Sequence, residues 1–325
     1  MGYKRYIIRR IVYLVPLFFG ISILNFSLMY MAGDPVRLMT LGNPSLNIDA
    51  VRRNLRAYYG LDQPLYIQYG MWLSRFLQGD LGNSFYSGLP VNTIIGMYAW
   101  ETMKLQLAAL ILALAIGVPI GIYSAKNQYS KLDITVTSSA ILGISIPIFY
   151  MGVVLIVVFS FFLQLFPSFG AHSLQVERYP FGNALLDELW HIALPAFAIG
   201  WVSMALYIRL IRSSMLEILR QDYILAARAS GLSERTIIFK HALRNAAIPL
   251  VTYVGIYLGL LLAGAPMTET VFTWPGLGYM FVSAVTKLDF PVIMGINMIV
   301  TLIILAVNLV TDLVYGLIDP RIRYE

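Results

Sequence analysis

The chain has 325 residues, of which 58% are hydrophobic and only 12% are charged. Because an average soluble domain carries roughly 25% charged residues, this composition and a mean hydropathy of +0.72 indicate a membrane protein. The absence of cysteine excludes a disulfide framework, a cysteine metal site and a thiol nucleophile in this chain. The net charge of +6 would indicate a nucleic-acid partner only if the basic residues shared one exposed face.

The apolar residues gather in uncharged runs long enough for membrane helices, which need about 20 residues each. The third run exceeds what a hydrocarbon core of roughly 30 Å requires, and Pro147 is expected to kink it. The pattern predicts an all-α polytopic membrane protein that forms a single integral domain over residues 1–325, with the first run as a retained anchor. The six predicted spans fall in residues 11–31, 105–125, 134–167, 191–208, 246–268 and 290–311.

The charges of the short loops predict the orientation of the chain. Fifteen Lys and Arg residues fall on the side of the two termini and seven on the other side. Both termini are therefore expected to be cytoplasmic. Seven of the fifteen lie in the inner loop 209–245. The positive charge is thus an orientation signal, and no nucleic-acid partner is expected.

The inner loop has the pattern of two helices joined by a sharp turn. Residues 214–230 are mostly good helix formers without Pro or Gly. Gly231 follows where a helix end favours positive φ, and Ser233 with Glu234 provides an N-cap and a first-turn acid for a second helix. The small residues of this hairpin either let a partner approach closely or pack it onto the inner ends of the spans, and the residues alone favour neither.

At this loop the sequence resembles the "EAA" loop of ATP-binding-cassette importer permeases. Ala226, Ala227 and Gly231 match that pattern. Three positions depart from it, with Leu225 in place of Glu, His241 in place of Ile and Arg244 in place of Pro. These departures are similar to the variant of the dipeptide, oligopeptide and nickel branch.

The resemblance extends along nearly the whole chain. Short sequence motifs similar to those of the same branch occur in order at 33–35 (Gly-Asp-Pro), 59–65 (Tyr-Gly-Leu-Asp-Gln-Pro-Leu), 79–82 (Gly-Asp-Leu-Gly), 269–272 (Glu-Thr-Val-Phe), 274–278 (Trp-Pro-Gly-Leu-Gly) and 317–324 (Leu-Ile-Asp-Pro-Arg-Ile-Arg-Tyr). Each motif alone is weak evidence of a relationship, but the order and spacing of the motifs make the chain similar to the B-type permease subunit of this branch. That resemblance implies a type I importer fold in a prokaryotic cell membrane.

That resemblance implies a set of partners. A second homologous permease would complete the translocation path in the lipid bilayer, two cytoplasmic ATPases would bind ATP and Mg²⁺, and an extracytoplasmic solute-binding protein would deliver di- or oligopeptides. It implies no cofactor and no catalysis in this chain. The ATPase-coupling residues it implies are Tyr223, Ala226, Ala227, Arg228, Ala229, Gly231, Leu232, Ser233, His241 and Arg244.

By the same resemblance, the outer loop 32–98 forms a scoop-like cap that docks the binding protein and closes an outer gate; otherwise it is a lid that only stabilises the span ends. Residues 274–278 fit a tight re-entrant turn, which near a membrane must line a water-filled cavity or be buried in protein. The candidate gate or binding-protein residues are Asp34, Asp62, Asp80, Trp274, Gly276 and Gly278.

Other polar residues allow competing interpretations. Asp312, the acid directly after the sixth predicted span, is either an interfacial structural partner of an Arg or a substrate residue. Glu188 and His191 share a helical face and with His172 could attract a metal, although three scattered ligands predict ordinary interface residues and no metal site.

Two other classes of protein remain as alternatives. An ATP-independent secondary transporter or channel predicts buried ionisable relays or inverted repeats, and neither is clear in the sequence. An intramembrane enzyme is disfavoured because the sequence lacks His-Glu-x-x-His, Gly-x-Ser-x-Gly and a Gly-Lys-Ser/Thr phosphate loop. For a transporter of the same type, oligosaccharides and nickel chelates are the alternative substrates to peptides.

Overall fold

The computed structural model describes residues 3–31, 53, 56, 60, 62–173 and 183–318. Within these ranges the regular structure is helical, and a single antiparallel bridge joins Asn83 to Pro90. The prediction of an all-α chain is confirmed for this part of the protein. The described residues fall into two compact units, which we call the terminal unit (Met1–Trp100 with Met280–Glu325) and the central unit (Glu101–Tyr279).

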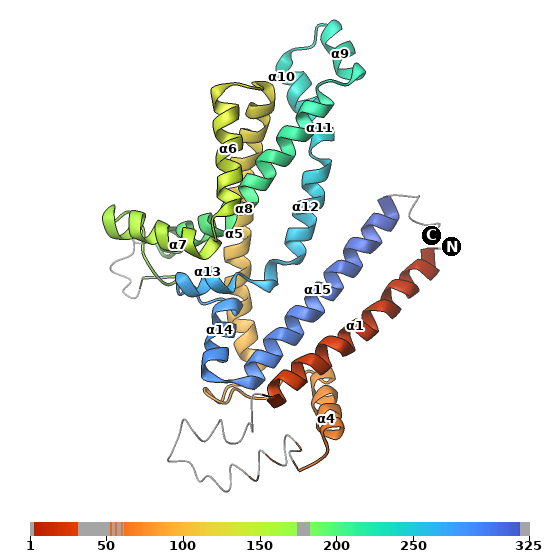
Figure 1. The fold of residues 1–325 in the computed structure, drawn as a ribbon, viewed down its shortest axis with the longest axis vertical. Coiled ribbons are helices and arrows are strands. Elements are labelled where there is room, and N and C mark those ends of the chain that lie inside the picture. Colours follow the sequence, from red (N-terminus) through yellow and green to blue (C-terminus); the bar gives the residue numbers. More distant parts are fainter. Residues whose placement is uncertain are drawn as a thin grey trace. The chain divides into compact units, whose positions relative to one another are not determined.

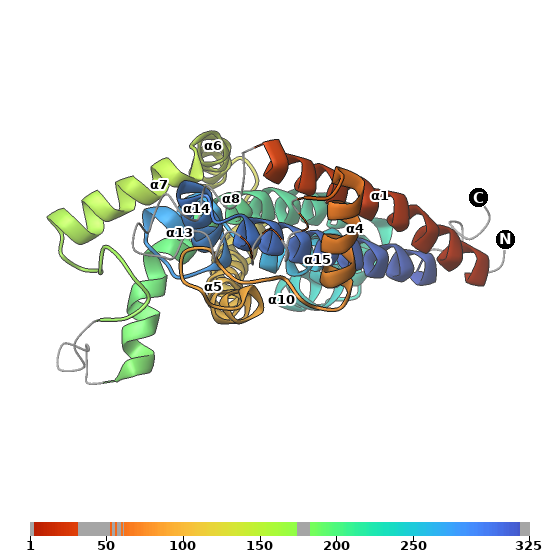
Figure 2. The ribbon, with the colours of Figure 1, turned by 90° about the horizontal axis from the view of Figure 1, so that it is seen from below.

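The terminal unit is built on two long helices that run side by side. These are α1 (Tyr3–Met31) and α15 (Phe290–Ile318), and α1 begins at the end of the pair where α15 ends (Figures 1 and 2). Phe26 and Met29 of α1 pack on Phe290 and Met294 of α15. The shorter α4 (Leu65–Leu77) adds its aromatic side chains to this core. The first turns of α5 (Val91–Lys126) and the end of α14 (Leu277–Lys287) complete the unit.

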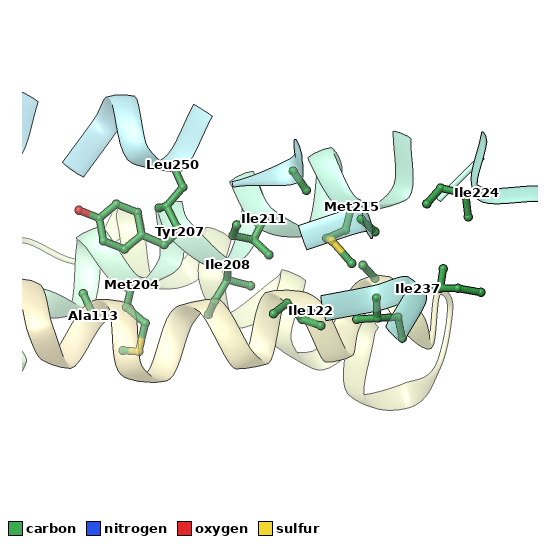
Figure 3. Packing of buried hydrophobic residues seen from close by; sticks show 14 of the residues in the cluster. Ala113, Ile122, Met204, Tyr207, Ile208, Ile211, Met215, Ile224, Ile237 and Leu250 are labelled. Atoms are coloured by element: carbon green, nitrogen blue, oxygen red, sulfur yellow. The ribbon is translucent and has the colours of Figure 1, made fainter. Parts of the chain in front are cut away.

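The central unit contains the rest of α5, the long helix α8 (Ala184–Ile218) and a series of shorter helices around it. Along α8, Met204, Tyr207, Ile211 and Met215 are buried at helical spacing, and Figure 3 shows them packed among residues of α5 and the following helices. The remaining helices are α6 (Lys131–Ser145), α7 (Ile148–Leu155), α9 (Asp222–Ala229), α10 (Glu234–Thr236), α11 (Leu243–Ala246), α12 (Ile248–Gly259) and α13 (Pro266–Val271), with π-helical turns at Ile156–Phe162 and Ile237–Ala242 and a 3₁₀ turn at Leu261–Ala263.

Glycines allow α5 and α8 to approach closely. A Cβ at Gly121 would lie 3.0 Å from the carbonyl oxygen of Ile208, and one at Gly117 would lie 3.1 Å from that of Met204. The two glycines are four residues apart on α5, which is the small-xxx-small spacing typical of closely packed membrane helices. The backbones of α5 and α8 therefore meet with no side chain between them at these points.

Four of the six predicted spans are long apolar helices in the structure: Val12–Met31, Val91–Lys126, Ala184–Ile218 and Phe290–Thr311. They correspond to the first, second, fourth and sixth apolar runs. Among the described residues these four are the helices long and apolar enough to cross a membrane. The number of spans and the cytoplasmic position of the termini remain predictions.

The third and fifth runs are divided into shorter helices. In the third, the expected kink at Pro147 is a complete break: α6 ends at Ser145, and Ile146 is extended with ψ 125° before Pro147 precedes α7. A proline disfavours helical geometry in the residue before it, which explains the break. In the fifth, Gly264 has φ +70° and Pro266 begins α13. Local backbone chemistry thus interrupts runs that are uniformly apolar.

Candidate functional site

The inner loop 209–245 forms the predicted helix–turn–helix, with one difference. The first helix was expected to run through 214–230, but α8 ends at Ile218 and α9 starts at Asp222 after an extended Gln221 with ψ 147°. No Pro or Gly marks this break, so the sequence pattern missed it. Figure 1 shows α9 beyond the C-terminal end of α8.

The turn after α9 is the one that the sequence predicts. Gly231 has φ +79°, and its N–H donates to the carbonyl oxygen of Arg228 at 3.0 Å. The N–H of Leu232 donates to the carbonyl oxygen of Ala227 at 3.3 Å. This pair of bonds is the Schellman arrangement, in which a residue with positive φ satisfies the last carbonyls of a helix. The expected positive φ of Gly231 is confirmed.

The second helix of the loop begins with the predicted cap. The Ser233 hydroxyl accepts a hydrogen bond from the N–H of Thr236 at 3.3 Å. Glu234 accepts from Nε of Arg228 at 2.9 Å, and both side chains are exposed. Arg228 therefore pairs with Glu234 inside the loop. The pair joins the two sides of the turn at Gly231.

The small residues of the loop lie on its surface. Ala226, Ala229 and Gly231 are exposed and Ala227 is half-buried. A Cβ at Gly231 would meet no described atom within 4 Å. The interpretation that small residues pack the loop onto the spans fits Ala227, which contacts the core of the central unit, but not the three exposed residues.

Large apolar side chains lie beside the small ones, while others anchor the loop. Tyr223 and Leu232 are exposed next to the small residues. Ile224 and Ile237 are fully buried in the core of the central unit. The amide of Asn245 donates to the Tyr223 hydroxyl at 2.9 Å and so ties α9 to α11. Of the remaining candidates, His241 is half-buried within the π-helical turn and Arg244 is exposed.

A buried ion pair at the start of the loop was not identified from the sequence. The carboxylate of Asp133, which is 2% exposed, accepts from Nε and Nη2 of Arg212 at 2.6 and 2.8 Å. It also accepts from the Ser124 hydroxyl and, at 2.9 Å, from the N–H of Tyr129. We call these four residues the Asp133 junction. It joins the turn between α5 and α6 to the last turns of α8, at the start of the inner loop.

The electrostatics of the junction favour the ionised carboxylate. The Arg212 guanidinium, the Ser124 hydroxyl and the Tyr129 N–H hold the pKa of Asp133 well below its usual range, although burial acts in the opposite direction. The only local signal in the sequence is Ser130, which caps α6 by accepting from the N–H of Asp133 at 3.2 Å. The contact with Arg212 crosses 79 positions and has no sequence pattern.

The predicted tight turn at 274–278 is present and buried. The N–H of Gly276 donates to the carbonyl oxygen of Trp274 at 2.7 Å, and Thr273 has φ +49°. The Trp274 side chain is fully buried, and its Nε1 donates to the carbonyl oxygen of Glu101 at 3.0 Å. The turn is therefore enclosed by protein, one of the two environments expected for irregular backbone near a membrane.

A buried carboxylate explains the glycines of this turn. Glu269 accepts from the N–H groups of Ala265 and Tyr279 at 3.2 and 2.9 Å and from the Thr102 hydroxyl at 3.2 Å. A Cβ at Gly276 would lie 2.4 Å from Oε2 of Glu269, and one at Gly278 would lie 2.6 Å from Cα of Pro266. A side chain at either glycine would therefore collide with the carboxylate or with the backbone around it.

The residues predicted for the outer gate or the binding-protein contact include both buried and exposed positions. Trp274, Gly276 and Gly278 are buried, whereas Asp62 and Asp80 are exposed. Asp80 accepts from the N–H of Gly82 at 2.9 Å. Asp34 lies outside the described residues, as do all residues from 32 to 52. The side chain of Asp312 is also outside the described part of the chain.

The residues considered for a metal separate into two sets. Glu188 pairs with Lys104, which also pairs with Glu101 at 2.9 Å. His191 and His172 instead face the buried Asp187, with N···O distances of 3.5 and 3.8 Å. No group of three ligands that could hold a metal ion occurs among the described residues. The ion pair with Lys104 explains why Glu188 does not join the histidines.

These features define a multi-pass membrane protein with a capped helical loop at one end of its central unit. Comparisons identify its family. Residues 117–324 match the family described as "Binding-protein-dependent transport system inner membrane component", and residues 3–95 match the corresponding N-terminal family. The chain belongs to this family of membrane permease subunits of ATP-binding-cassette transporters.

Individual relatives match the chain over nearly its full length. It is 41% identical to the oligopeptide transport system permease protein AppB of Bacillus subtilis, over 98% of this chain and 99% of that protein. It is 38% identical to the dipeptide transport system permease protein DppB of Escherichia coli K12, over 99% of both chains. The di/tripeptide transport system permease protein DppB of Pseudomonas aeruginosa is also 38% identical, over 98% of this chain and 99% of that protein.

Proposed function

We propose that this chain is one permease subunit of an ATP-driven importer of di- or oligopeptides. The observation that carries the proposal is the full-length similarity to permeases whose names specify dipeptide, oligopeptide or di/tripeptide transport. In this proposal a second, homologous permease completes the translocation path. An extracytoplasmic solute-binding protein delivers the peptide, and two cytoplasmic ATPases hold ATP and Mg²⁺. The chain spans the cell membrane six times with both termini in the cytoplasm.

The exposed surface of the inner loop is the proposed contact with one ATPase. Exposed Ala226, Ala229 and Gly231 let a partner approach the backbone, and exposed Tyr223 and Leu232 add apolar area beside them. Burial of such area on association is favourable. The buried Ile224 supports the proposal because it fixes α9 to the central unit.

The path from this surface into the membrane is short and rigid. α8 runs without interruption from Ala184 to Ile218 and ends three residues before α9. The Asp133 junction fixes its last turns to the α5–α6 turn. A displacement of the loop on ATP binding would therefore move α8, α5 and α6 together. ATP would act by binding differently to inward-open and outward-open states.

At the outer end, we propose that loop 32–98 docks the binding protein and that the 274–278 turn supports an outer gate. Because Trp274, Gly276 and Gly278 are buried, their proposed role is to hold the turn around Glu269 rather than to touch the partner. The exposed Asp62 and Asp80 remain candidates for direct contact.

Reconstitution of the complete transporter in liposomes tests this proposal. Peptide with its binding protein should stimulate ATP hydrolysis and drive uptake of labelled peptide. Uptake of an oligosaccharide or a nickel chelate, without uptake of peptide, would show that the substrate is not a peptide. Uptake that persists without ATP would contradict the transporter class.

A matched pair of alanine substitutions tests the loop contact. Ala226→Trp adds bulk at an exposed position on α9, where it has room in this chain but not against a docked partner. We expect peptide-stimulated ATP hydrolysis to fall at least tenfold, because loss of about 1.4 kcal/mol of interface energy is one tenfold step. Ala184→Trp, at the exposed opposite end of α8, should leave the rate unchanged. Equal rates in both variants would remove the loop from the ATPase contact.

A further inference from the structure

A groove on the central unit has apolar walls and no role in the proposed function. It lies between α5, α6 and α8 and has a volume of about 260 Å³. Ile116 and Ile120 of α5, Val136 and Ala140 of α6, and α8 residues from Phe197 to Ile208 form its walls. Apolar cavities of roughly 150 Å³ stay dry and accept apolar ligands. The groove therefore suits an apolar occupant rather than water.

The polar groups beside the groove do not suit a peptide. The hydroxyl of Thr135, which lines the groove, donates to the carbonyl oxygen of Lys131 in its own helix at 2.8 Å. Nε1 of Trp201 is buried against α6, where a Cβ at Gly143 would lie 2.5 Å from it. The Ser139 hydroxyl is the remaining polar side-chain group of the lining, so a peptide backbone placed here would leave most of its N–H and C=O groups unpaired, at a substantial free-energy cost.

The length of the groove matches half a bilayer. Its wall on α8 extends from Phe197 to Ile208, which at 1.5 Å per residue is about 16 Å. Half of a hydrocarbon core of roughly 30 Å is about 15 Å. An acyl chain of one leaflet would therefore follow the groove for its full length.

Basic side chains stand where the groove ends. Arg209 directly follows Ile208, and Lys131 lies one helical turn before Thr135. Both are exposed, and neither forms a salt bridge with another residue that the structure describes. Arg212, in contrast, is held by Asp133. Two cations without a salt-bridge partner among the described residues thus follow the apolar walls at one end of the groove.

We propose that this groove binds an anionic phospholipid. One acyl chain occupies the space between α5, α6 and α8, and the side chains of Lys131 and Arg209 hold the headgroup phosphate. Each basic residue near an anionic membrane surface gives about a fivefold preference for the anionic lipid. Together the two predict a preference of roughly 25-fold over a zwitterionic lipid with the same chains.

Trp201 lines the groove and serves as the reporter. The assembled transporter is placed in nanodiscs that contain phosphatidylglycerol or phosphatidylcholine with brominated acyl chains, and bromine quenches tryptophan fluorescence on contact. The Trp201 signal is the difference between the native transporter and its Trp201→Phe variant. At low mole fractions, brominated phosphatidylglycerol should quench this signal more strongly than brominated phosphatidylcholine.

Three variants test the two parts of the site separately. Lys131→Gln with Arg209→Gln should abolish the preference for phosphatidylglycerol and retain quenching by either lipid. Ser139→Phe, at an exposed position in the groove, should abolish quenching by both lipids. Lys126→Gln, six residues after Ile120 and on another face of α5, should retain the preference.

Two results would overturn the proposal. If neither brominated lipid quenched Trp201, the groove would be covered by protein, as a sister permease would do. If both lipids quenched it equally in the native transporter, the basic residues would hold no headgroup. Transport activity does not enter either readout, so failure here is separate from failure of the proposed import function.

Discussion

Asp133 shows how one buried charge joins helices that are distant in sequence. Its carboxylate, 2% exposed, accepts bonds from α5, from the α5–α6 turn and from α8. Such a pair stabilises the folded state little more than well-packed apolar side chains would. The loss of one partner, however, leaves an uncompensated buried charge. The junction is therefore more sensitive to single substitutions than exposed pairs are.

The Asp133→Asn variant should be strongly destabilised. Removal of the negative charge leaves Arg212 unpaired in a mostly buried position, at a cost of about 3 kcal/mol. The matched control is Arg228→Gln, which breaks the exposed pair with Glu234 at a cost of under about 1 kcal/mol. Thermal unfolding of the detergent-solubilised transporter should show a midpoint several degrees lower for Asp133→Asn alone. Equal midpoints for the two variants would contradict the importance of the junction.

The same pair predicts the direction of a pH effect. The pKa of Asp133 is lowered in the folded chain, so the pair stabilises the fold at pH values above the unfolded pKa, about 3.9. This stabilisation is lost as the pH falls below that value towards the folded pKa. The midpoint difference between native and Asp133→Asn transporters should stay constant from pH 7 to about pH 5 and shrink below about pH 4. A difference that already shrinks between pH 7 and 5 would disagree with a lowered pKa.

At the level of helices, close contact between α5 and α8 depends on the absence of a side chain at two positions of α5. Gly117 and Gly121 bring the backbone of α5 against carbonyl groups of α8. In a membrane, association of helices depends on packing more than on exclusion of water, which makes such contacts valuable. Backbone atoms cannot move aside as the end of a flexible side chain can.

Gly121→Ala should therefore destabilise the central unit. Its Cβ would lie 3.0 Å from the Ile208 carbonyl oxygen and from two side-chain atoms of Ile211, and overpacking of this kind costs about 1–3 kcal/mol. The control is Gly255→Ala on α12, where a Cβ would meet no described atom within 4 Å. That variant should be neutral or up to about 1 kcal/mol more stable, because alanine favours helix. Thermal unfolding midpoints of the two variants test this prediction. Equal midpoints for Gly121→Ala and Gly255→Ala would exclude tight packing at Gly121.

Helix boundaries show where sequence patterns succeed and where they fail. The turn at Gly231 and the cap at Ser233 were predictable because each depends on a few consecutive residues. The break before Asp222 was not, since Leu219 to Gln221 contain no helix breaker. Pro147 correctly predicted where the third run divides. The helix is completely broken there, however, whereas only a kink was predicted.

At the scale of the whole molecule, the orientation in the membrane is the main prediction still to be tested. Because the chain has no cysteine, single cysteines can be introduced without background. Ala229→Cys on the inner loop and Tyr86→Cys on the outer loop are both at exposed positions. An impermeant maleimide added to intact cells should label Tyr86→Cys only. Ala229→Cys should react only after the membrane is opened, and the opposite pattern would invert the topology.

Composition and local patterns alone predicted the membrane class, the helical fold and the turn of the inner loop, and short motifs carried the resemblance to the family, because apolar runs, charge bias and motifs are properties of neighbouring residues. Only the tertiary structure decided that Asp133 pairs with Arg212, that Glu269 is enclosed by the turn at Gly276, and that Arg228 faces Glu234. It also revealed the groove beside Trp201. These features depend on which faces of separate helices meet, and packing between distant segments sets that contact.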